Sequence, residues 1–466
     1  MKLSFLGANR QVTGSQYCLE AGGSKILIDC GLYQERAYLQ RNWEPSPVPV
    51  DELDALLLTH VHVDHCGLIP KLAQQGFRRP IYCTPPSIDL AGIILRDAAH
   101  IQMEDAAYKK KRHRKEGRQS KHPEIPLYTD EDALAALPLF QPAAYGETIR
   151  VSDAIAVTFH EAGHILGSAM LELQVTEGDR RRRLLFSGDV GQWDKPLMKD
   201  PTTFDEADYV VMESTYGDRD HPDEGDIETQ LCDVINQTAS HGGAVIIPTF
   251  AVERAQEVMY HISRLVYADR IPDLQIFLDS PMAVDVTQIF RKHRDCFDDE
   301  TWQLIDSDEP PLRFAGLQLV RSVQDSKAIN SVRVPCVIMA TSGMCTAGRV
   351  KHHLKDRIGD PRNTVLFVGY QGRGTLGRQI LEGKQSVRIH GRMRNVRAKI
   401  QQIHGFSGHA DRGALLRWLA ALQHPPRHLF LTHGEEEVSL GLADHIRAEM
   451  GWSVSVPSYR DSVELE

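Results

Sequence analysis

A short segment dense in histidine constrains this chain more than any other feature. It is Thr-His-Val-His-Val-Asp-His at 59–65, and it follows an apolar run that we expect to form a buried strand. His60 and His62 are two residues apart, so in an extended chain their side chains point the same way. Asp64 and His65 are adjacent and diverge at the start of a predicted helix. One loop of this kind can supply ligands to two metal ions.

Three further candidate ligands follow apolar strands elsewhere in the chain. They are His164, Asp189 and His433, and each lies close to a glycine, as a ligand in a loop would. A single histidine of this kind is more often structural or surface-exposed than a ligand. The combination with the segment 59–65 is therefore what favours a metal site.

The rhythm of predicted strands and helices changes twice along the 466 residues. In the first part, short strands are separated by glycine-rich turns, with helices expected at 64–75 and 87–118. In the middle part, strands alternate strictly with helices, which predicts a parallel sheet covered on both faces. Near the C-terminus the short strands resume. We predict an α/β protein with a first domain, 1–213 and 386–466, interrupted by an inserted domain, 214–385.

Composition limits the partners and the compartment. Lys and Arg total 53 and Asp and Glu total 63, and the net charge of −10 does not suggest a non-specific nucleic-acid binder. The eight scattered cysteines contain no C-x-x-C, which favours reduced thiols in the cytoplasm. No apolar run reaches the roughly 18 residues that cross a membrane, and the first residues lack the apolar core of a secretory signal. We expect a cytoplasmic protein without a membrane partner.

In their order along the chain, these motifs resemble those of the metallo-β-lactamase fold, an αββα sandwich. Asp29, after the apolar Ile-Leu-Ile, is similar to the first motif of that fold. The segment 60–65 resembles the second motif, His164 the third and Asp189 the fourth. The resemblance extends over essentially the whole chain.

Within that fold, the chain resembles the β-CASP ribonucleases, which carry an inserted parallel α/β domain. Glu213 in Glu-Ser-Thr-Tyr-Gly is similar to motif A of that family, His409 in Gly-His-Ala-Asp to motif B, and His433 to motif C. The chain is similar in particular to the endonuclease subunit of the pre-mRNA cleavage and polyadenylation specificity factor and its prokaryotic relatives.

The resemblance implies two Zn²⁺ ions per chain, because nitrogen-rich and sulfur-free sites of this kind suit zinc. The implied ligands are His60, His62 and His164 for one ion, Asp64, His65 and His433 for the other, and Asp189 as a bridge. Asp29 is implied to orient a ligand histidine, with a structural aspartate in a turn as the alternative. Asp64, Asp189, Glu213 and His409 are the implied catalytic residues. Of these, His409 is the expected general acid, and Glu213 is expected to keep its ring protonated.

Candidate phosphate contacts lie in the predicted inserted domain. Ser342, Gly343 and Met344 follow an apolar strand and resemble the family's phosphate-binding loop, although an ordinary turn has the same pattern. Arg373 and Arg378 lie in a glycine-rich segment that also resembles a family segment. Basic residues cluster at 109–118 and 388–399, where they could bind phosphates, but a charged run is more often a solvated face.

These features predict a zinc-dependent ribonuclease, an endonuclease in RNA processing or decay. The alternatives are a 5′-to-3′ exoribonuclease, a DNA nuclease of the same fold and a non-catalytic RNA-binding scaffold. In the DNA-repair branch of the family, motif C resembles a valine, so His433 favours RNA. RNA is therefore the expected partner, and a homodimer remains open.

Overall fold

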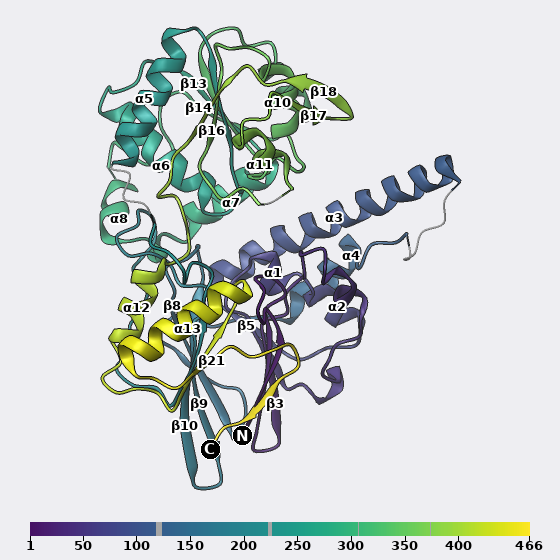
Figure 1. The fold of residues 1–466 in the computed structure, drawn as a ribbon, viewed down its shortest axis with the longest axis vertical. Coiled ribbons are helices and arrows are strands. Elements are labelled where there is room, and N and C mark those ends of the chain that lie inside the picture. Colours follow the sequence, from purple (N-terminus) through teal and green to yellow (C-terminus); the bar gives the residue numbers. More distant parts are fainter. Residues whose placement is uncertain (118–123, 222–225, 306, 373) are drawn as a thin grey trace. The chain divides into compact units, whose positions relative to one another are not determined.

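The computed structural model describes residues 1–117, 124–221, 226–305, 307–372 and 374–466. Contacts between residues divide the chain into two compact units. Unit 1 comprises Met1–Trp193, Asp200–Asp220 and His409–Glu466, and unit 2 comprises Asp194–Lys199 and His221–Gly408. In Figure 1, unit 1 is drawn mainly in purple, blue and yellow, and unit 2 in teal and green.

Unit 1 contains two sheets of seven strands each. The first sheet has the strand order β22 (Ser462–Glu464), β1 (Lys2–Gly7), β2 (Gln16–Ala21), β3 (Ser24–Ile28), β4 (Ala55–Leu57), β5 (Ile81–Cys83) and β6 (Phe140–Pro142). The second sheet has the order β21 (Val454–Ser455), β20 (His428–Thr432), β11 (Tyr209–Glu213), β10 (Arg180–Phe186), β9 (Ala169–Glu177), β8 (Ile155–Glu161) and β7 (Thr148–Arg150). Both sheets contain antiparallel and parallel pairs.

The two sheets of unit 1 pack face to face over a shared apolar core. Alternate residues such as Leu3 and Phe5 on β1 point into this core and meet residues of the second sheet, because side chains in a strand alternate between its faces. The rings of Phe5 and Phe430, one from each sheet, lie 5.1 Å apart. Burial of this apolar surface is the main stabilising contribution to such a sandwich.

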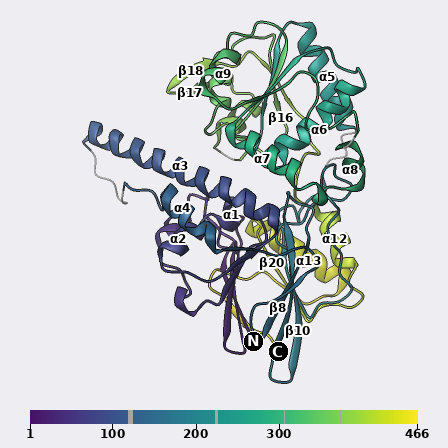
Figure 2. The same cartoon turned by 180° about the vertical axis from the view of Figure 1, so that it is seen from behind.

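Helices cover the outer faces of the two sheets, as Figures 1 and 2 show from opposite sides. The helices on the side of the first sheet are α1 (Val63–Cys66), α2 (Ile69–Gln74), α3 (Pro85–Glu116) and α4 (Asp130–Ala136). Those on the second sheet are α12 (Arg412–Ala420) and α13 (Glu436–Met450), which bury Trp418 and Leu442 in a second core. Unit 1 is therefore an αββα sandwich, and this fold class is confirmed.

Unit 2 is built around a parallel sheet of six strands. The strand order is β14 (Leu317–Val320), β13 (Gln275–Asp279), β15 (Cys336–Ala340), β12 (Ala244–Pro248), β16 (Thr364–Phe367) and β19 (Lys399–Gln402). The helices between these strands are α5 (Ile227–Ser240), α6 (Arg254–Tyr267), α7 (Pro281–Lys292), α8 (Asp299–Ile305), α9 (Val323–Ile329), α10 (Val350–Arg357) and α11 (Leu376–Leu381). A hairpin of β17 (Ser386–Ile389) and β18 (Arg392–Asn395) follows α11.

Two details of the structure differ from the pattern expected from the sequence. The segment 386–408 lies in unit 2 and not with the C-terminal part of unit 1, because β19 pairs with β16 and Val387 packs in the core of unit 2. The helix expected at 64–75 is two short helices, broken after Gly67. A Cβ at that glycine would lie 2.4 Å from the carbonyl oxygen of Val63, so only glycine fits this break.

The cysteines and the helix lengths bear on two further predictions from the sequence. All eight cysteines are buried free thiols, in agreement with the absence of a disulfide framework. Across the described ranges, the structure has no helix long and apolar enough to span a bilayer.

Candidate metal centre

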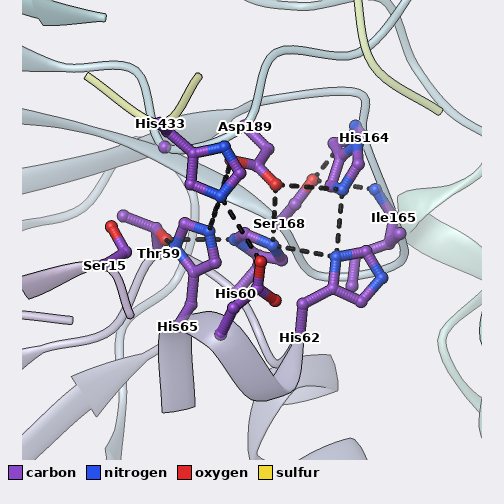
Figure 3. Close-up of polar contacts among 12 residues, drawn as sticks. Ser15, Thr59, His60, His62, His65, His164, Ile165, Ser168, Asp189 and His433 are labelled. Atoms are coloured by element: carbon purple, nitrogen blue, oxygen red, sulfur yellow. Dashed lines mark hydrogen bonds and ion pairs between the residues drawn. The ribbon is translucent and has the colours of Figure 1, made fainter. Parts of the chain in front are cut away.

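The histidine segment is positioned by the end of β4, a central strand of the first sheet. The flanking strands β3 and β5 run parallel to β4 and fix the direction in which the chain leaves it. His62 immediately precedes the first turn of α1, so that Asp64 and His65 project from the start of that helix. His60 and His65 are each only 1% exposed. The segment thus holds its imidazole rings inside unit 1, as Figure 3 shows.

Three other loops bring candidate ligands to the same place. His164 lies between β8 and β9, Asp189 follows β10, and His433 follows β20. The side-chain oxygen of Ser168 accepts hydrogen bonds from the backbone N–H groups of His164 (3.1 Å) and Ile165 (3.2 Å), which closes the His164 loop. All four loops converge in Figure 3 and belong to unit 1.

One group of donor atoms consists of His60, His62, His164 and Asp189, whose ligand atoms all lie within 4.8 Å of one another. Nδ1 of His62 is 3.1 Å from Nε2 of His60 and 3.2 Å from Nε2 of His164. Oδ2 of Asp189 is 3.3 Å from Nε2 of His60. A single ring nitrogen has one lone pair or one hydrogen, so Nδ1 of His62 cannot satisfy both neighbouring nitrogens. The arrangement is better explained by ring nitrogens whose lone pairs face a common cation than by hydrogen bonds between the rings.

A second group consists of Asp64, His65 and His433, whose ligand atoms also lie within 4.8 Å of one another. Nε2 of His433 is 3.0 Å from Nε2 of His65 and 3.4 Å from Oδ2 of Asp64. The other carboxylate oxygen of Asp189, Oδ1, is 3.3 Å from Nε2 of His65. Asp189 therefore faces the first group with Oδ2 and the second with Oδ1.

The charges of the first group suit a metal cation. Burial is the largest influence on its histidines, and it lowers the pKa of His60 and His164 and that of His62 to about 3. These imidazoles are neutral at pH 7 and can offer lone pairs to a metal. Burial alone would raise the pKa of Asp189, but His433, His65 and other histidines outweigh it and hold that pKa well below its usual range. Oδ1 of Asp189 is buried and accepts no hydrogen bond from the described residues.

The second group holds more negative charge. Burial lowers the pKa of His65 and His433, but Asp189 and the neighbouring aspartates outweigh burial and raise both values. A cation bound at this group would therefore displace protons from the rings. Nitrogen and oxygen donors without sulfur, arranged in two groups that share a carboxylate, fit two zinc ions.

Asp29 contacts a ligand histidine on the side of its ring that faces away from the donor group. Its Oδ2 lies 2.7 Å from Nδ1 of His65, and its Oδ1 accepts a hydrogen bond from the backbone N–H of Thr59 (2.8 Å). The carboxylate can hold the hydrogen of His65 on Nδ1, which directs the lone pair of Nε2 toward the second group. This contact places Asp29 where it can orient His65, and that role stays a prediction.

The first prediction concerns this contact. Asp29→Asn keeps the size of the side chain, and asparagine tolerates the positive φ of 56° at this position. It replaces one acceptor oxygen by an amide donor, so we expect zinc affinity to fall by about 10–100-fold. Competition with a chromophoric chelator measures this affinity. Asp54→Asn is the matched control, because Asp54 accepts a hydrogen bond from Lys25 at the other end of the same strands. Equal affinity in Asp29→Asn and wild type would contradict the assigned role.

His409 and Glu213 form a pair next to the ligands. Nδ1 of His409 lies 3.2 Å from both carboxylate oxygens of Glu213 and 3.8 Å from Oδ2 of Asp189. Burial opposes the charge on the ring, but Glu213 and Asp189 outweigh it and raise the pKa of His409 to about 9. The backbone N–H of Val190 donates to Glu213 (2.6 Å) and fixes its carboxylate. The His409 side chain is 22% exposed, whereas that of His433 is 3% exposed, so a substrate can reach the His409 ring.

Family models match three parts of the chain. A model described as the metallo-beta-lactamase superfamily matches residues 10–215, and one described as a Beta-Casp domain matches residues 255–380. A third, described as a Zn-dependent metallo-hydrolase RNA specificity domain, matches residues 393–457. All the residues of both donor groups, together with Glu213, lie within the first and third matches.

The chain is also similar to whole proteins. It is 39% identical to Ribonuclease TTHA0252 of Thermus thermophilus over 465 residues, which cover 100% of both chains. The chain belongs to the β-CASP family of the metallo-β-lactamase superfamily. It is 33% identical to Transcription termination factor FttA of Methanocaldococcus jannaschii, over 100% of this chain and 72% of that one. A crystal structure of a protein of unknown function from Enterococcus faecalis V583 aligns with a TM-score of 0.53 at 10% identity, over 100% of this chain and 99% of that chain, which is a likeness of fold alone.

Several residues around this β-CASP centre were not predicted from the sequence. The hydroxyl of Thr59 lies 2.9 Å from Asp29 Oδ2 and 3.1 Å from His60 Nδ1. The hydroxyl of Thr215 lies 3.1 Å from His433 Nδ1 and donates to the backbone oxygen of the same residue. Both threonines are neighbours of predicted site residues, in the segments Thr-His-Val-His and Glu-Ser-Thr-Tyr-Gly. That adjacency was the only available signal.

The predicted phosphate contacts that the structure describes belong to unit 2, whereas the candidate metal ligands belong to unit 1. Ser342 turns its hydroxyl onto its own loop, where it accepts hydrogen bonds from the N–H groups of Thr346 and Ala347. Gly343 and Met344 follow in the same loop. Arg378 is exposed and pairs with Glu382 (2.7 Å). Arg373 lies outside the described residues. The loop at Ser342 is therefore held by its own hydrogen bonds, and its role in phosphate binding stays a prediction.

Proposed function

We propose that this protein is a zinc-dependent ribonuclease that hydrolyses RNA phosphodiester bonds endonucleolytically, in RNA processing or decay in the cytoplasm. The observation that carries the proposal is Asp189, whose two oxygens face two separate groups of donors. The family and the printed name of the Thermus relative support RNA as the substrate.

In this proposal, one zinc ion is held by His60, His62 and His164, and a second by Asp64, His65 and His433, with Asp189 shared. Bound zinc would supply Lewis acidity, which makes water a nucleophile near neutral pH and stabilises negative charge on phosphate oxygens. The role of this chain is to fix the ligands, through Asp29, Thr59 and the strand ends that carry them.

The leaving oxygen of a phosphodiester needs a proton, and His409 is placed to supply it. Glu213 engages Nδ1, so the protonated ring carries its transferable hydrogen on Nε2. A pKa raised to about 9 keeps the ring charged at pH 7. His409 then acts as the general acid and Glu213 as the residue that positions and charges it.

Unit 2 is proposed to hold the RNA strand. The loop Ser342, Gly343 and Met344, together with Arg373 and Arg378, is assigned to phosphates of the bound RNA. We likewise propose that unit 1 corresponds to the catalytic domain and unit 2 to the inserted β-CASP domain.

Labelled substrates test the mode of action. The zinc-loaded protein is incubated with a 30-nucleotide RNA labelled at the 5′ end, the same RNA labelled at the 3′ end, and DNA of matched sequence. Internal cuts that give products of intermediate length from both labels are expected for RNA. Mononucleotides from the 5′ label identify a 5′-to-3′ exonuclease, and preferential cutting of DNA identifies a DNA nuclease. Tight RNA binding without any cleavage identifies a scaffold.

The second prediction concerns metal content. Protein purified without chelator is expected to contain about two zinc ions per chain, because Asp189 contacts both donor groups. Elemental analysis of the chain measures this number. Dialysis against a chelator should abolish RNA cleavage, and added Zn²⁺ should restore it. Purified wild-type protein that cleaves RNA without a transition metal would overturn the two-zinc assignment.

A further inference from the structure

Helix α3 reaches from the metal centre to a remote part of unit 1. Its start is fixed to the loop of His164, because the hydroxyls of Thr84 (2.6 Å) and Ser87 (2.9 Å) both donate to the carbonyl oxygen of Gly167. The helix has 32 residues, which at 1.5 Å per residue span about 48 Å. Figures 1 and 2 both show its second half extending beyond the rest of unit 1.

The end of this helix carries a dense group of cations. We call residues Tyr108–Lys115 the α3 arm. Six of its side chains are positively charged and exposed to solvent. They are Lys109, Lys110, Lys111, Arg112, Arg114 and Lys115. Within the described residues none of the six pairs with a carboxylate, in a chain whose net charge is −10.

A solvated helix end does not explain this arrangement. Cations in the last turn complement the helix dipole, but that effect fades within one turn and does not extend to Lys109 or Lys110. Lys110 and Arg114, and likewise Lys111 and Lys115, are like charges four residues apart, which destabilises a helix. Blocks of about five or more like charges repel one another and often belong to interaction segments. An anionic partner would offset this repulsion.

The neighbouring aromatic residue indicates what kind of anion. Tyr108 directly precedes the cations, and 66% of it is exposed. Exposed rings among basic side chains are typical of single-stranded nucleic-acid sites, where bases stack on the ring and cations bind the phosphates. His113 contacts Glu124 (2.5 Å), whereas Lys109, Lys110 and Lys111 are exposed to solvent.

We propose that the α3 arm binds the backbone of single-stranded RNA whose other end lies in the metal centre. This inference rests on the proposed ribonuclease function. Lys109 to Lys115 lie 24–30 residues beyond the helix start at Pro85, or about 36–45 Å. A strand stacked at about 3.4 Å per nucleotide needs roughly 11–13 nucleotides to span this length of the helix. The arm therefore favours long substrates over short ones.

Binding of two oligouridylates of different length tests the proposal. The probes are fluorescent RNAs of 5 and 25 nucleotides, measured in the His409→Ala background to slow cleavage. Lys109→Gln, Lys110→Gln and Lys111→Gln together should weaken binding of the 25-mer about ten-fold. They should also reduce the slope of log K against log [salt] by about 2, at about 0.7 per lost phosphate contact. Binding of the 5-mer should not change.

Two further variants separate charge from structure. Arg79→Gln, Arg180→Gln and Arg181→Gln remove three exposed cations from other parts of unit 1 and should leave both RNAs bound as before. Lys109→Arg, Lys110→Arg and Lys111→Arg together keep the charge and should bind the 25-mer as tightly as the parent. The proposal is overturned if the glutamine variant keeps the affinity and salt slope of its parent, or if the control variant loses as much. If the wild-type protein does not cleave RNA, the proposed function is refuted. The effect of the substitutions on RNA binding can still be measured in that case.

Discussion

Asp189→Asn is expected to lose at least one zinc ion per chain and to lower kcat for RNA cleavage by about 10⁴-fold or more. One oxygen of Asp189 faces the first donor group and the other faces the second, so its loss weakens both. A zinc ion held at each group would contribute several kcal/mol to stabilising the transition state, and about 1.4 kcal/mol corresponds to a tenfold change in rate. Elemental analysis and single-turnover cleavage on the same preparation measure the two effects.

Asn keeps the size of the side chain, so the effect can be separated from a packing defect. Asp208→Asn is the matched control, because Asp208 lies before the start of β11 and pairs with Arg427. That variant should keep its zinc and its activity. If Asp189→Asn bound two zinc ions and cleaved RNA at the wild-type rate, the shared-ligand assignment would be wrong.

His409→Ala is expected to lower kcat by about 10²–10⁴-fold while zinc content stays nearly unchanged. The general acid acts only in the transition state, and neither of the two donor groups includes His409. Glu213→Gln should give a milder loss of the same kind, because it removes the charge that keeps the His409 ring protonated. His433→Ala should differ from both, with loss of zinc as well as activity.

The comparison of these three variants can fail in two informative ways. A His409→Ala protein that cleaves RNA rapidly would show that another group protonates the leaving oxygen. A His409→Ala protein that loses zinc, next to a His433→Ala protein that keeps it, would exchange the two assignments. Zinc content and cleavage are measured on the same preparations, so that a folding defect appears in both readouts and in circular dichroism.

Local sequence was sufficient for the ligands within one loop. His60, His62, Asp64 and His65 lie at a strand end and in the first turn of a helix, and both features are indicated by the local sequence pattern. Thr59 and Thr215 escaped prediction because threonine is common in and beside strands. Their contacts with Asp29 and His433 join residues 30 and 218 positions apart.

The boundary of the inserted domain also depends on contacts between residues that are distant in sequence. The first two strands of 386–402 are short and antiparallel, like those in the N-terminal part of the chain. The local pattern therefore assigned this segment to the first domain. Their true position depends on β19 pairing with β16, a register that is decided by packing and not by local preference. The break between α1 and α2 was missed because it depends on how closely Gly67 approaches Val63.

The division of unit 1 into separate chain segments has a consequence for biosynthesis. The first donor group is complete once Asp189 has emerged from the ribosome, whereas the second waits for His433, which lies 433 − 189 = 244 residues later. At about 5–20 residues per second, this interval lasts roughly 12–50 s. During that time unit 2 is synthesised while β1 still lacks its partner β22. On the proposed assignment, the first donor group is therefore complete throughout this interval, whereas the second group, and with it RNA cleavage, waits for His433.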